Sequence, residues 1–580
     1  MMSCAAATRF LAVSSLACVA VGAVPVSELS AVYRHGQIFL TWSEGDTPEG
    51  TNFNVYSHSV PITAATLGKA TQVGHHVERH SARDWWQDPA SFDRKAEPGE
   101  PAGFVVESGT DPLDPGGGLF VHTVIKGDPE TLYFAVTVTA PDRAEDRTIV
   151  PGENALLEGV SGKLALIQPI WLSKSAAPAA GAGKGKNLIL SLHGRGGGVT
   201  AGKRKGTVNC LVFRSVGHGW REGLPSKFRL SVGATSVVIS PMDRVWVGRP
   251  VKESRDARDH CPAVNTWWYG YNRHIYETTL TAETVCPNYT ERYLLYLVRW
   301  AQKYLGTDPP RTYIKGGSMG GSGTVAMALH FPDVFAAAFA QVPVYSCTKP
   351  GKGSATRLEC TCGPLNKPAF TADGTPLLEY MNGALQISKA TGDIPPIFAT
   401  NGRKDGSIPW ENNPPFYSAA NQSRQAFAVY WNNGAHGMSR DAPADCKAWG
   451  RQFTRYRLDQ SYPVFSSYSD NRNYGSGHAA DGDLQGWINR GLDWADPVDT
   501  PREHALTVTA IYEGIAYPVT VDVTPRRLQK FKLRPGDSVQ ATVGPAKPVT
   551  LAVDRHGLLT VPKVVINDAK GTRIRLVRGE

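Results

Sequence analysis

Residues 312–321 read Thr-Tyr-Ile-Lys-Gly-Gly-Ser-Met-Gly-Gly, and this stretch decides the fold of the chain. A short apolar strand runs into a Gly-x-Ser-x-Gly turn, and residues 323–331 continue with the spacing and composition of a helix. A serine on such a strand-to-helix turn has a strained backbone, and the flanking glycines avoid side chains that would clash there. The helix amino terminus also favours negative charge at the site. The stretch predicts that Ser318 is a nucleophile at the end of a buried strand.

Two partners follow in the order that an activated serine needs. A serine is a weak nucleophile unless a base takes its proton and an acid orients that base. Residues 396–400 form a predicted strand, and Asp405 lies in the loop after it. Residues 426–431 form another, and His436 follows. The order Ser318, Asp405, His436 predicts a catalytic triad; a solvated turn aspartate and a surface-loop histidine are the alternatives.

A glycine-rich loop lies upstream of these three residues. Residues 188–192 form an apolar strand that ends in His-Gly-Arg-Gly-Gly-Gly, residues 193–198. This segment resembles the oxyanion segment of lipases and esterases, in which backbone N–H groups stabilise the developing negative charge. We expect the N–H groups of Arg195, Gly196 and Met319 to serve there. A phosphate-binding loop is the other interpretation, but no Gly-Lys-Ser/Thr follows.

The surrounding pattern indicates an α/β sheet. Residues 187–193, 235–241 and 394–400 are continuous apolar runs of the kind buried in a parallel sheet, and residues 290–305 have helical spacing. With the three motifs in order, residues 165–460 resemble the α/β-hydrolase superfamily, near its secreted esterase and prolyl-oligopeptidase-like branches. The resemblance implies a mostly parallel, eight-stranded sheet and acyl transfer through an acyl-enzyme on Ser318.

Both flanks of this region show strand periodicity. Short alternating strands separated by turn residues begin near residue 30 and indicate an antiparallel sandwich. Residues 37–42, 54–56 and 132–139 resemble a fibronectin type III domain. Alternation returns from about residue 500 and predicts a second β-domain. The predicted fold class is therefore α/β, with an α/β-hydrolase sheet flanked by N-terminal and C-terminal β-sandwich-like domains.

The amino terminus resembles an export signal. Arg9 precedes an apolar run over residues 10–24, and small residues before position 24 suit cleavage after Ala23. A lipoprotein signal or an uncleaved anchor helix are the alternatives. We expect a secreted or periplasmic protein, and four parts: a signal peptide (1–23), a fibronectin type III-like sandwich (24–165), the catalytic domain (166–460), and a connecting segment with the C-terminal β-domain (461–580).

Composition excludes several classes of protein. A chain of 580 residues is too long for one core, and 41% hydrophobic with 19% charged residues is ordinary for a globular protein. A mean hydropathy of −0.26, without an internal apolar run of about 18 residues, argues against a polytopic membrane protein. The net charge of +9 is spread along the chain without a basic block, so no nucleic-acid partner is expected.

Cysteines lie in the middle of the chain once the signal is removed. In an exported protein such clustering favours up to three disulfides within one domain and one remaining thiol. The pair at 360 and 362 has the wrong spacing for a zinc site, and we expect no metal or cofactor. The seven are Cys210, Cys261, Cys286, Cys347, Cys360, Cys362 and Cys446.

Substrate clues are few. Trp267, Trp268 and Tyr269 belong to an aromatic cluster that could line an acyl or sugar cleft, or fill the core. The excursion over residues 347–394 could form a rim over the cleft, and residues 470–483 hold a weak calcium candidate.

Taken together, the motifs predict a serine carboxylester hydrolase acting on an ester, possibly one within a polysaccharide or polyester. A serine exopeptidase or oligopeptidase of the same fold is the second interpretation, and a non-catalytic polymer-binding protein is the third. We expect no stable membrane insertion. The acyl group, the disulfide pairing and the oligomeric state are not predicted by the sequence.

Overall fold

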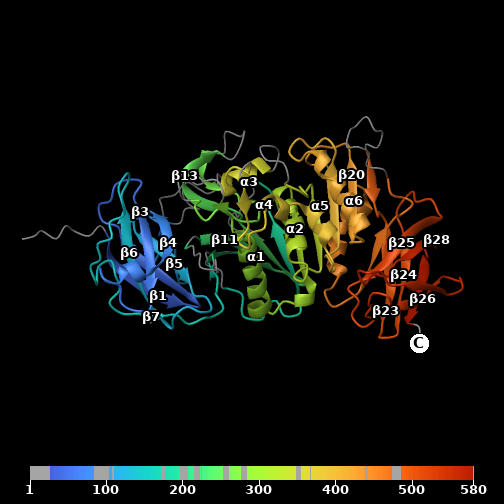
Figure 1. Ribbon diagram of the computed structural model, residues 1–580, viewed down its shortest axis with the longest axis horizontal. Coiled ribbons are helices and arrows are strands. Elements are labelled where there is room, and N and C mark those ends of the chain that lie inside the picture. Colours follow the sequence, from blue (N-terminus) through green and yellow to red (C-terminus); the bar gives the residue numbers. More distant parts are fainter. Residues whose placement is uncertain are drawn as a thin grey trace, which may run out of the picture.

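A computed structural model describes most of the chain, in three parts that follow one another along the longest axis (Figure 1). None of its described helices is long and apolar enough to cross a membrane. The predicted signal peptide, Gly196 and most of the calcium candidate lie outside the described residues. These residues are 26–83, 103–107, 110–171, 177–195, 207–214, 223, 225–252, 260–275, 284–347, 355–365, 368–437, 442–472 and 485–578.

The N-terminal part consists of two antiparallel sheets that face each other. Alternating side chains from both sheets, such as Ile38, Leu40, Phe53 and Phe134, pack into one buried core. The likeness to a fibronectin type III domain stays a prediction. One sheet has the order β1 (Ser27–Arg34), β2 (Gln37–Ser43), β5 (Gly118–Thr123), and the other β4 (Thr71–Glu78), β3 (Asn52–His58), β6 (Thr131–Thr139), β7 (Val160–Ser161).

The central part is built on a sheet with ten described strands. Six of them, from β12 to β20, run parallel. Parallel strands of this kind are buried on both faces, which agrees with the continuous apolar runs in their sequences. The order is β22 (Gly486–Ile488), β20 (Phe427–Asn432), β19 (Ile397–Gly402), β17 (Ala337–Gln341), β16 (Thr312–Gly317), β9 (Asn187–Leu192), β12 (Ser236–Pro241), β11 (Pro225–Val232), β10 (Thr207–Phe213), β8 (Ile170–Trp171).

The prediction of eight strands was therefore too low. The two edge strands, β8 and β22, have two and three residues, which is too short for alternation to be visible in a sequence. The strand β22 also lies beyond residue 460, so the sheet includes a segment outside the predicted catalytic domain (166–460).

Helices pack on this sheet, and two small ribbons lie beside it. The nucleophile helix α2 contacts β16 and β17 and packs against α5. The helices are α1 (Tyr289–Trp300), continued by a π-helical turn at Ala301–Leu305, α2 (Met319–His330), α3 (Ala355–Cys362), α4 (Leu377–Tyr380), α5 (Gly383–Lys389), α6 (Pro414–Gln422) and α7 (Ala444–Gln452). The ribbons pair β13 (Val245–Lys252) with β14 (His260–Val264) and β15 (Thr284–Val285) with β18 (Ala369–Phe370).

The C-terminal part again has two antiparallel sheets around one apolar core, which includes Val508, Val521, Phe531 and Leu576. One sheet has the order β21 (Tyr462–Ser466), β25 (Val519–Arg526), β28 (Val561–Ile566). The other has the order β23 (Leu492–Asp499), β24 (Glu503–Ala510), β29 (Thr572–Arg578), β26 (Ser538–Val543), β27 (Val549–Ala552).

Cys210, Cys286, Cys362 and Cys446 are free thiols in the part of the chain that the structure describes, so no predicted disulfide joins any two of them. Cys210 on β10 is near one edge of the sheet, whereas Cys446 on α7 is near the other, so these two cannot pair. Cys286 and Cys362 are neighbours, and the Cys286 thiol donates to the Cys362 carbonyl at 3.5 Å. A second hydrogen bond, between the Cys286 and Cys362 thiols, raises the pKa of the Cys362 thiol together with burial.

Candidate active site

Ser318 occupies a sharp turn between β16 and α2. Its φ of 58° and ψ of −124° lie in a region that non-glycine residues rarely adopt. The turn is held because the Ser318 N–H donates to the carbonyl of Gln341, at the end of β17, at 2.8 Å. Strained backbone of this kind persists where the surrounding structure fixes it, and it lifts the hydroxyl above the end of the sheet.

Glycines around Ser318 allow the helix to approach its neighbours closely. A Cβ at Gly320 would lie 2.3 Å from the carbonyl oxygen of Leu192 on β9. A Cβ at Gly323 would lie 2.5 Å from the ring of Trp268. Because contacts under 3.0 Å are not tolerated, the glycine-rich sequence is required by packing as well as by the turn.

The structure brings Ser318, His436 and Asp405 together in one hydrogen-bonded chain. His436 Nε2 lies 2.7 Å from Ser318 Oγ, and His436 Nδ1 lies 2.7 Å from Asp405 Oδ2. Since the carboxylate can only accept, Nδ1 carries the proton and Nε2 accepts from the serine hydroxyl. The three residues follow β16, β19 and β20, whose carboxyl ends meet at one edge of the sheet.

Burial differs along this chain of three residues. The side chain of Asp405 is 2% exposed, and its second oxygen, Oδ1, accepts from the N–H groups of Ser407 at 2.8 Å and Ile408 at 3.0 Å. The carboxylate is thereby fixed in one orientation. The His436 side chain is 38% exposed, so substrate and water can reach the imidazole.

Two of the predicted oxyanion donors, Arg195 and Met319, belong to the described residues. A Cβ on Gly194 would lie 3.3 Å from the Ser318 Cβ, so the loop after β9 passes next to the nucleophile. Arg195 continues this loop, and Gly196 lies outside the described residues. Met319 is the first residue of α2, where a backbone N–H has no partner within the helix.

A hydrogen-bonded network behind this loop was not predicted. His193 Nδ1 lies 2.8 Å from the Gly194 carbonyl oxygen, and His193 Nε2 accepts from the Asp243 N–H at 2.9 Å. The Trp268 indole N–H donates to the His193 carbonyl at 3.3 Å. The His193-Gly194-x-Gly motif pointed to the loop but gave the imidazole no role, and Asp243 belongs to no recognisable motif.

The three predicted aromatic residues have different surroundings. Trp267 lines a cavity, whereas Trp268 packs edge-on against His193, with ring centroids 4.9 Å apart. The Tyr269 hydroxyl donates to the carbonyl of Cys286 inside the core. Trp267 and Trp268 both have positive φ angles, 56° and 64°, and the Asp243 carboxylate accepts the Trp268 N–H at 3.1 Å. Trp268 and Tyr269 therefore belong to the core rather than to a cleft.

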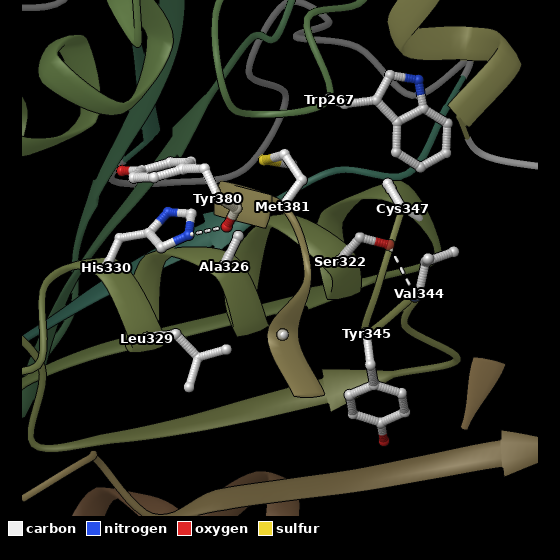
Figure 2. Close-up of a pocket in the computed structure, with 11 residues that line it drawn as sticks. Trp267, Ser322, Ala326, Leu329, His330, Val344, Tyr345, Cys347, Tyr380 and Met381 are labelled. Carbon is white, nitrogen blue, oxygen red and sulfur yellow. Dashed lines mark hydrogen bonds between the residues drawn. The ribbon is translucent and has the colours of Figure 1, made fainter. Parts of the chain in front are cut away.

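The cavity that Trp267 lines extends along one face of α2 (Figure 2). The cavity is narrow, with room for little more than water, and it is partly open to solvent. Ser322 begins this face one turn after Ser318, donating to the Ser318 carbonyl at 3.2 Å and accepting from the Val344 N–H at 2.9 Å. The excursion after β17 supplies Tyr380, Met381 and Gly383. The remaining lining residues are Ala326, Leu329, His330, Val344, Tyr345 and Cys347.

The described residues include no group of three or more His, Cys, Asp or Glu side chains placed to hold a metal ion. Residues 294–454, which carry Ser318, Asp405 and His436, match the prolyl oligopeptidase family. A search of curated protein sequences found no match.

Several solved structures are similar to parts of this chain. An S-formylglutathione hydrolase from Agrobacterium tumefaciens is 14% identical, with 48% of this chain and 86% of that chain covered and a TM-score of 0.33. Esterase 2 of Thermogutta terrifontis is 16% identical, with 47% of this chain and 81% of that chain covered and a TM-score of 0.25. A candidate dipeptidyl aminopeptidase IV from Bacteroides ovatus is 13% identical, with 74% of this chain and 56% of that chain covered and a TM-score of 0.28. Likenesses this weak do not indicate a substrate.

Proposed function

We propose that this serine hydrolase cleaves carboxylic esters through an acyl-enzyme on Ser318. The observation that carries the proposal is the hydrogen-bonded chain from Ser318 Oγ through His436 to Asp405, with 2.7 Å at each step. Such a chain activates a hydroxyl that is otherwise a weak nucleophile at neutral pH.

The reaction follows from this geometry. Ser318 Oγ attacks the ester carbonyl carbon while His436 Nε2 takes the hydroxyl proton, and Asp405 stabilises the imidazolium. The carbonyl oxygen becomes an oxyanion that accepts from the N–H groups of Met319 and Arg195. When the intermediate collapses, the alcohol leaves with the proton from His436. Water, deprotonated by His436, then releases the acid and restores Ser318.

An apolar surface lies along α2, next to the turn of Ser318. Ser322, whose hydroxyl donates to the Ser318 carbonyl, and Ala326 belong to this surface, whereas Ser318 does not line the cavity itself. Most of its lining is apolar or aromatic, and none of its lining residues is acidic. We therefore propose that the part of the substrate facing this surface is apolar, while the ester carbonyl lies between Ser318 and the loop after β9.

A serine peptidase is the second candidate, and the match of residues 294–454 to the prolyl oligopeptidase family favours it. The chemistry at Ser318 is the same, with an amine leaving instead of an alcohol. An exopeptidase of the aminopeptidase type must also recognise a substrate ammonium group. The absence of acidic residues from the described cavity lining supports the ester over such a peptide.

The test is a hydrolysis panel on the purified protein with Ser318→Ala and, as matched control, Ser388→Ala. Ser388 is exposed on α5 and donates within its own helix. We expect ester turnover that falls by about 10³-fold or more in Ser318→Ala and is unchanged in Ser388→Ala. A fluorophosphonate should label the wild type and the control only. Faster cleavage of aminoacyl amides would assign the protein to the peptidases, and a wild type that is neither active nor labelled would favour a binding protein.

Export is part of the same proposal. The apolar run over residues 10–24 after Arg9 supports it. Determining the amino-terminal residue of protein recovered from the periplasm or medium tests it, and we expect Val24.

A further inference from the structure

The backbone N–H of Arg195 can stabilise an oxyanion only if its peptide plane has one fixed direction. In a trans peptide, the carbonyl of one residue and the N–H of the next point in opposite directions within one plane. The direction of the Arg195 N–H is therefore set by whatever holds the Gly194 carbonyl. That carbonyl is held by the imidazole of His193, whose Nδ1 lies 2.8 Å away.

The contacts of His193 allow one protonation state. Its Nδ1 faces a carbonyl oxygen and must donate, whereas its Nε2 faces the Asp243 N–H and must accept. A proton on Nε2 would set two N–H groups against each other. Burial agrees with this assignment, because it lowers the pKa of His193 to about 4. The His193 ring is therefore a neutral and rigid support at neutral pH.

Asp243 connects this support to the rest of the site. Its carboxylate accepts from the N–H groups of Thr266 at 3.2 Å and Trp268 at 3.1 Å, and from the Thr266 hydroxyl. Trp268 donates in turn to the His193 carbonyl and packs against Gly323 of α2. The loop after β9 and the helix that begins at Ser318 are thus joined through one network.

We propose that His193, Asp243 and Trp268 are positioning residues that aim the Arg195 N–H at the oxyanion of the substrate. The inference rests on the proposed function, because it concerns the same attack by Ser318. None of the three touches the substrate. Their effect is on the transition state, where the oxyanion exists, and hardly on the bound ester.

The experiment measures kcat, KM and the affinity for a trifluoromethyl ketone built on the best ester's acyl group. Such a ketone forms a tetrahedral oxyanion adduct with the serine. In His193→Leu we expect kcat and ketone affinity to fall together by about 10²-fold, with KM within a few-fold of wild type. His193→Asn, whose amide N–H can replace Nδ1–H, should recover most of the loss. Trp268→Phe should lose about three- to tenfold in both.

A matched control separates positioning from general loosening. His504 is another histidine whose pKa burial lowers to about 4, but it lies on β24 of the C-terminal part. His504→Leu should leave kcat, KM and ketone affinity within about twofold of wild type, whatever its melting temperature.

Three outcomes would overturn the inference. One is a His193→Leu enzyme that binds the ketone as tightly as wild type, and another is a rise in KM that accounts for the whole loss. If His193→Leu does not fold, the Trp268→Phe enzyme provides the test. An unchanged ketone affinity in Trp268→Phe would refute the positioning role of the network. A wild type that the ketone does not inhibit contradicts the proposed function instead, so the two failures are distinguishable.

Discussion

The backbone around Asp405 fixes the orientation of its carboxylate. Two backbone N–H groups bind Oδ1, which leaves Oδ2 for His436 Nδ1. The carboxylate thus selects the imidazole tautomer that can accept the Ser318 proton.

Replacing this carboxylate by an amide should preserve the shape of the site and remove its base. In Asp405→Asn the side-chain amide can donate to Nδ1, which favours the tautomer with its proton on Nε2. We expect kcat at neutral pH to fall by about 10³- to 10⁴-fold with an unchanged melting temperature. Asp373→Asn, in the turn before α4, is the control and should keep full activity. A loss of less than tenfold in Asp405→Asn would contradict the role of Asp405.

His504 allows a prediction about stability against pH. Burial lowers the pKa of His504 to about 4 in the folded chain, against about 6.5 in the unfolded chain. The unfolded chain therefore binds the proton first as the pH falls. The neutral histidine contributes stability that is complete above about pH 6.5 and is lost progressively down to pH 4, by about 3 kcal/mol.

Unfolding by urea at pH 7 and pH 4 measures this contribution. Between these pH values, the free energy of unfolding of the wild type should fall by about 3 kcal/mol more than that of His504→Leu. The comparison uses the difference in unfolding free energy between the two proteins. The contributions of groups that titrate in both proteins are therefore removed. Parallel pH profiles would show that the folded chain protonates His504 normally.

At the scale of the elements, the sequence predicted the strands and helices that have a clear local periodicity. Ser318, Asp405 and His436 each follow a strong apolar strand, and strand order then places them at one edge of the sheet. The network of His193, Asp243 and Trp268 could not be predicted, because its members come from three loops without a common motif. The edge strands escaped prediction because two or three residues carry no period.

The packing of α2 on β9 gives a prediction for the helix as a unit. In Gly320→Ala the new methyl would meet the Leu192 carbonyl at 2.3 Å and the His193 carbonyl at 2.7 Å. Since these are backbone atoms, α2 must move and displace Ser318. We expect a loss of about 1–3 kcal/mol in stability and strongly reduced labelling of Ser318 by a fluorophosphonate. Gly68→Ala, where the methyl meets nothing within 4 Å, should change neither quantity.

At the scale of the whole molecule, ionic contacts join the C-terminal part to the catalytic sheet. Arg526 is buried on β25, and its Nε lies 2.6 Å from Asp393 Oδ1 in the segment before β19. The Arg527 N–H donates to Asp393 Oδ2 at 3.0 Å, and its guanidinium donates to the Ala336 carbonyl at 3.3 Å. The two parts are therefore held together by specific polar contacts.

Removing Asp393 should loosen this junction. Asp393→Ala leaves the buried Arg526 guanidinium without its carboxylate, and we expect a loss of about 2 kcal/mol in unfolding free energy. Limited proteolysis should then cleave the C-terminal part faster than in wild type. Asp568→Ala removes an exposed carboxylate that binds within its own turn, and it serves as the control. Equal proteolysis of Asp393→Ala and Asp568→Ala would mean that the ion pair does not hold the junction.

The short edge strand β22 affects the order in which the protein can mature on the ribosome. It pairs residues 486–488 with β20, the strand that carries the loop of His436. Synthesis proceeds from the amino terminus, so a nascent chain that has already released all three residues of the triad still exposes the backbone of β20. An unpaired strand edge invites pairing with other chains. The edge of the catalytic sheet at β20 is covered only after residues 486–488 have been translated. We therefore expect chains that end before residue 488 to aggregate.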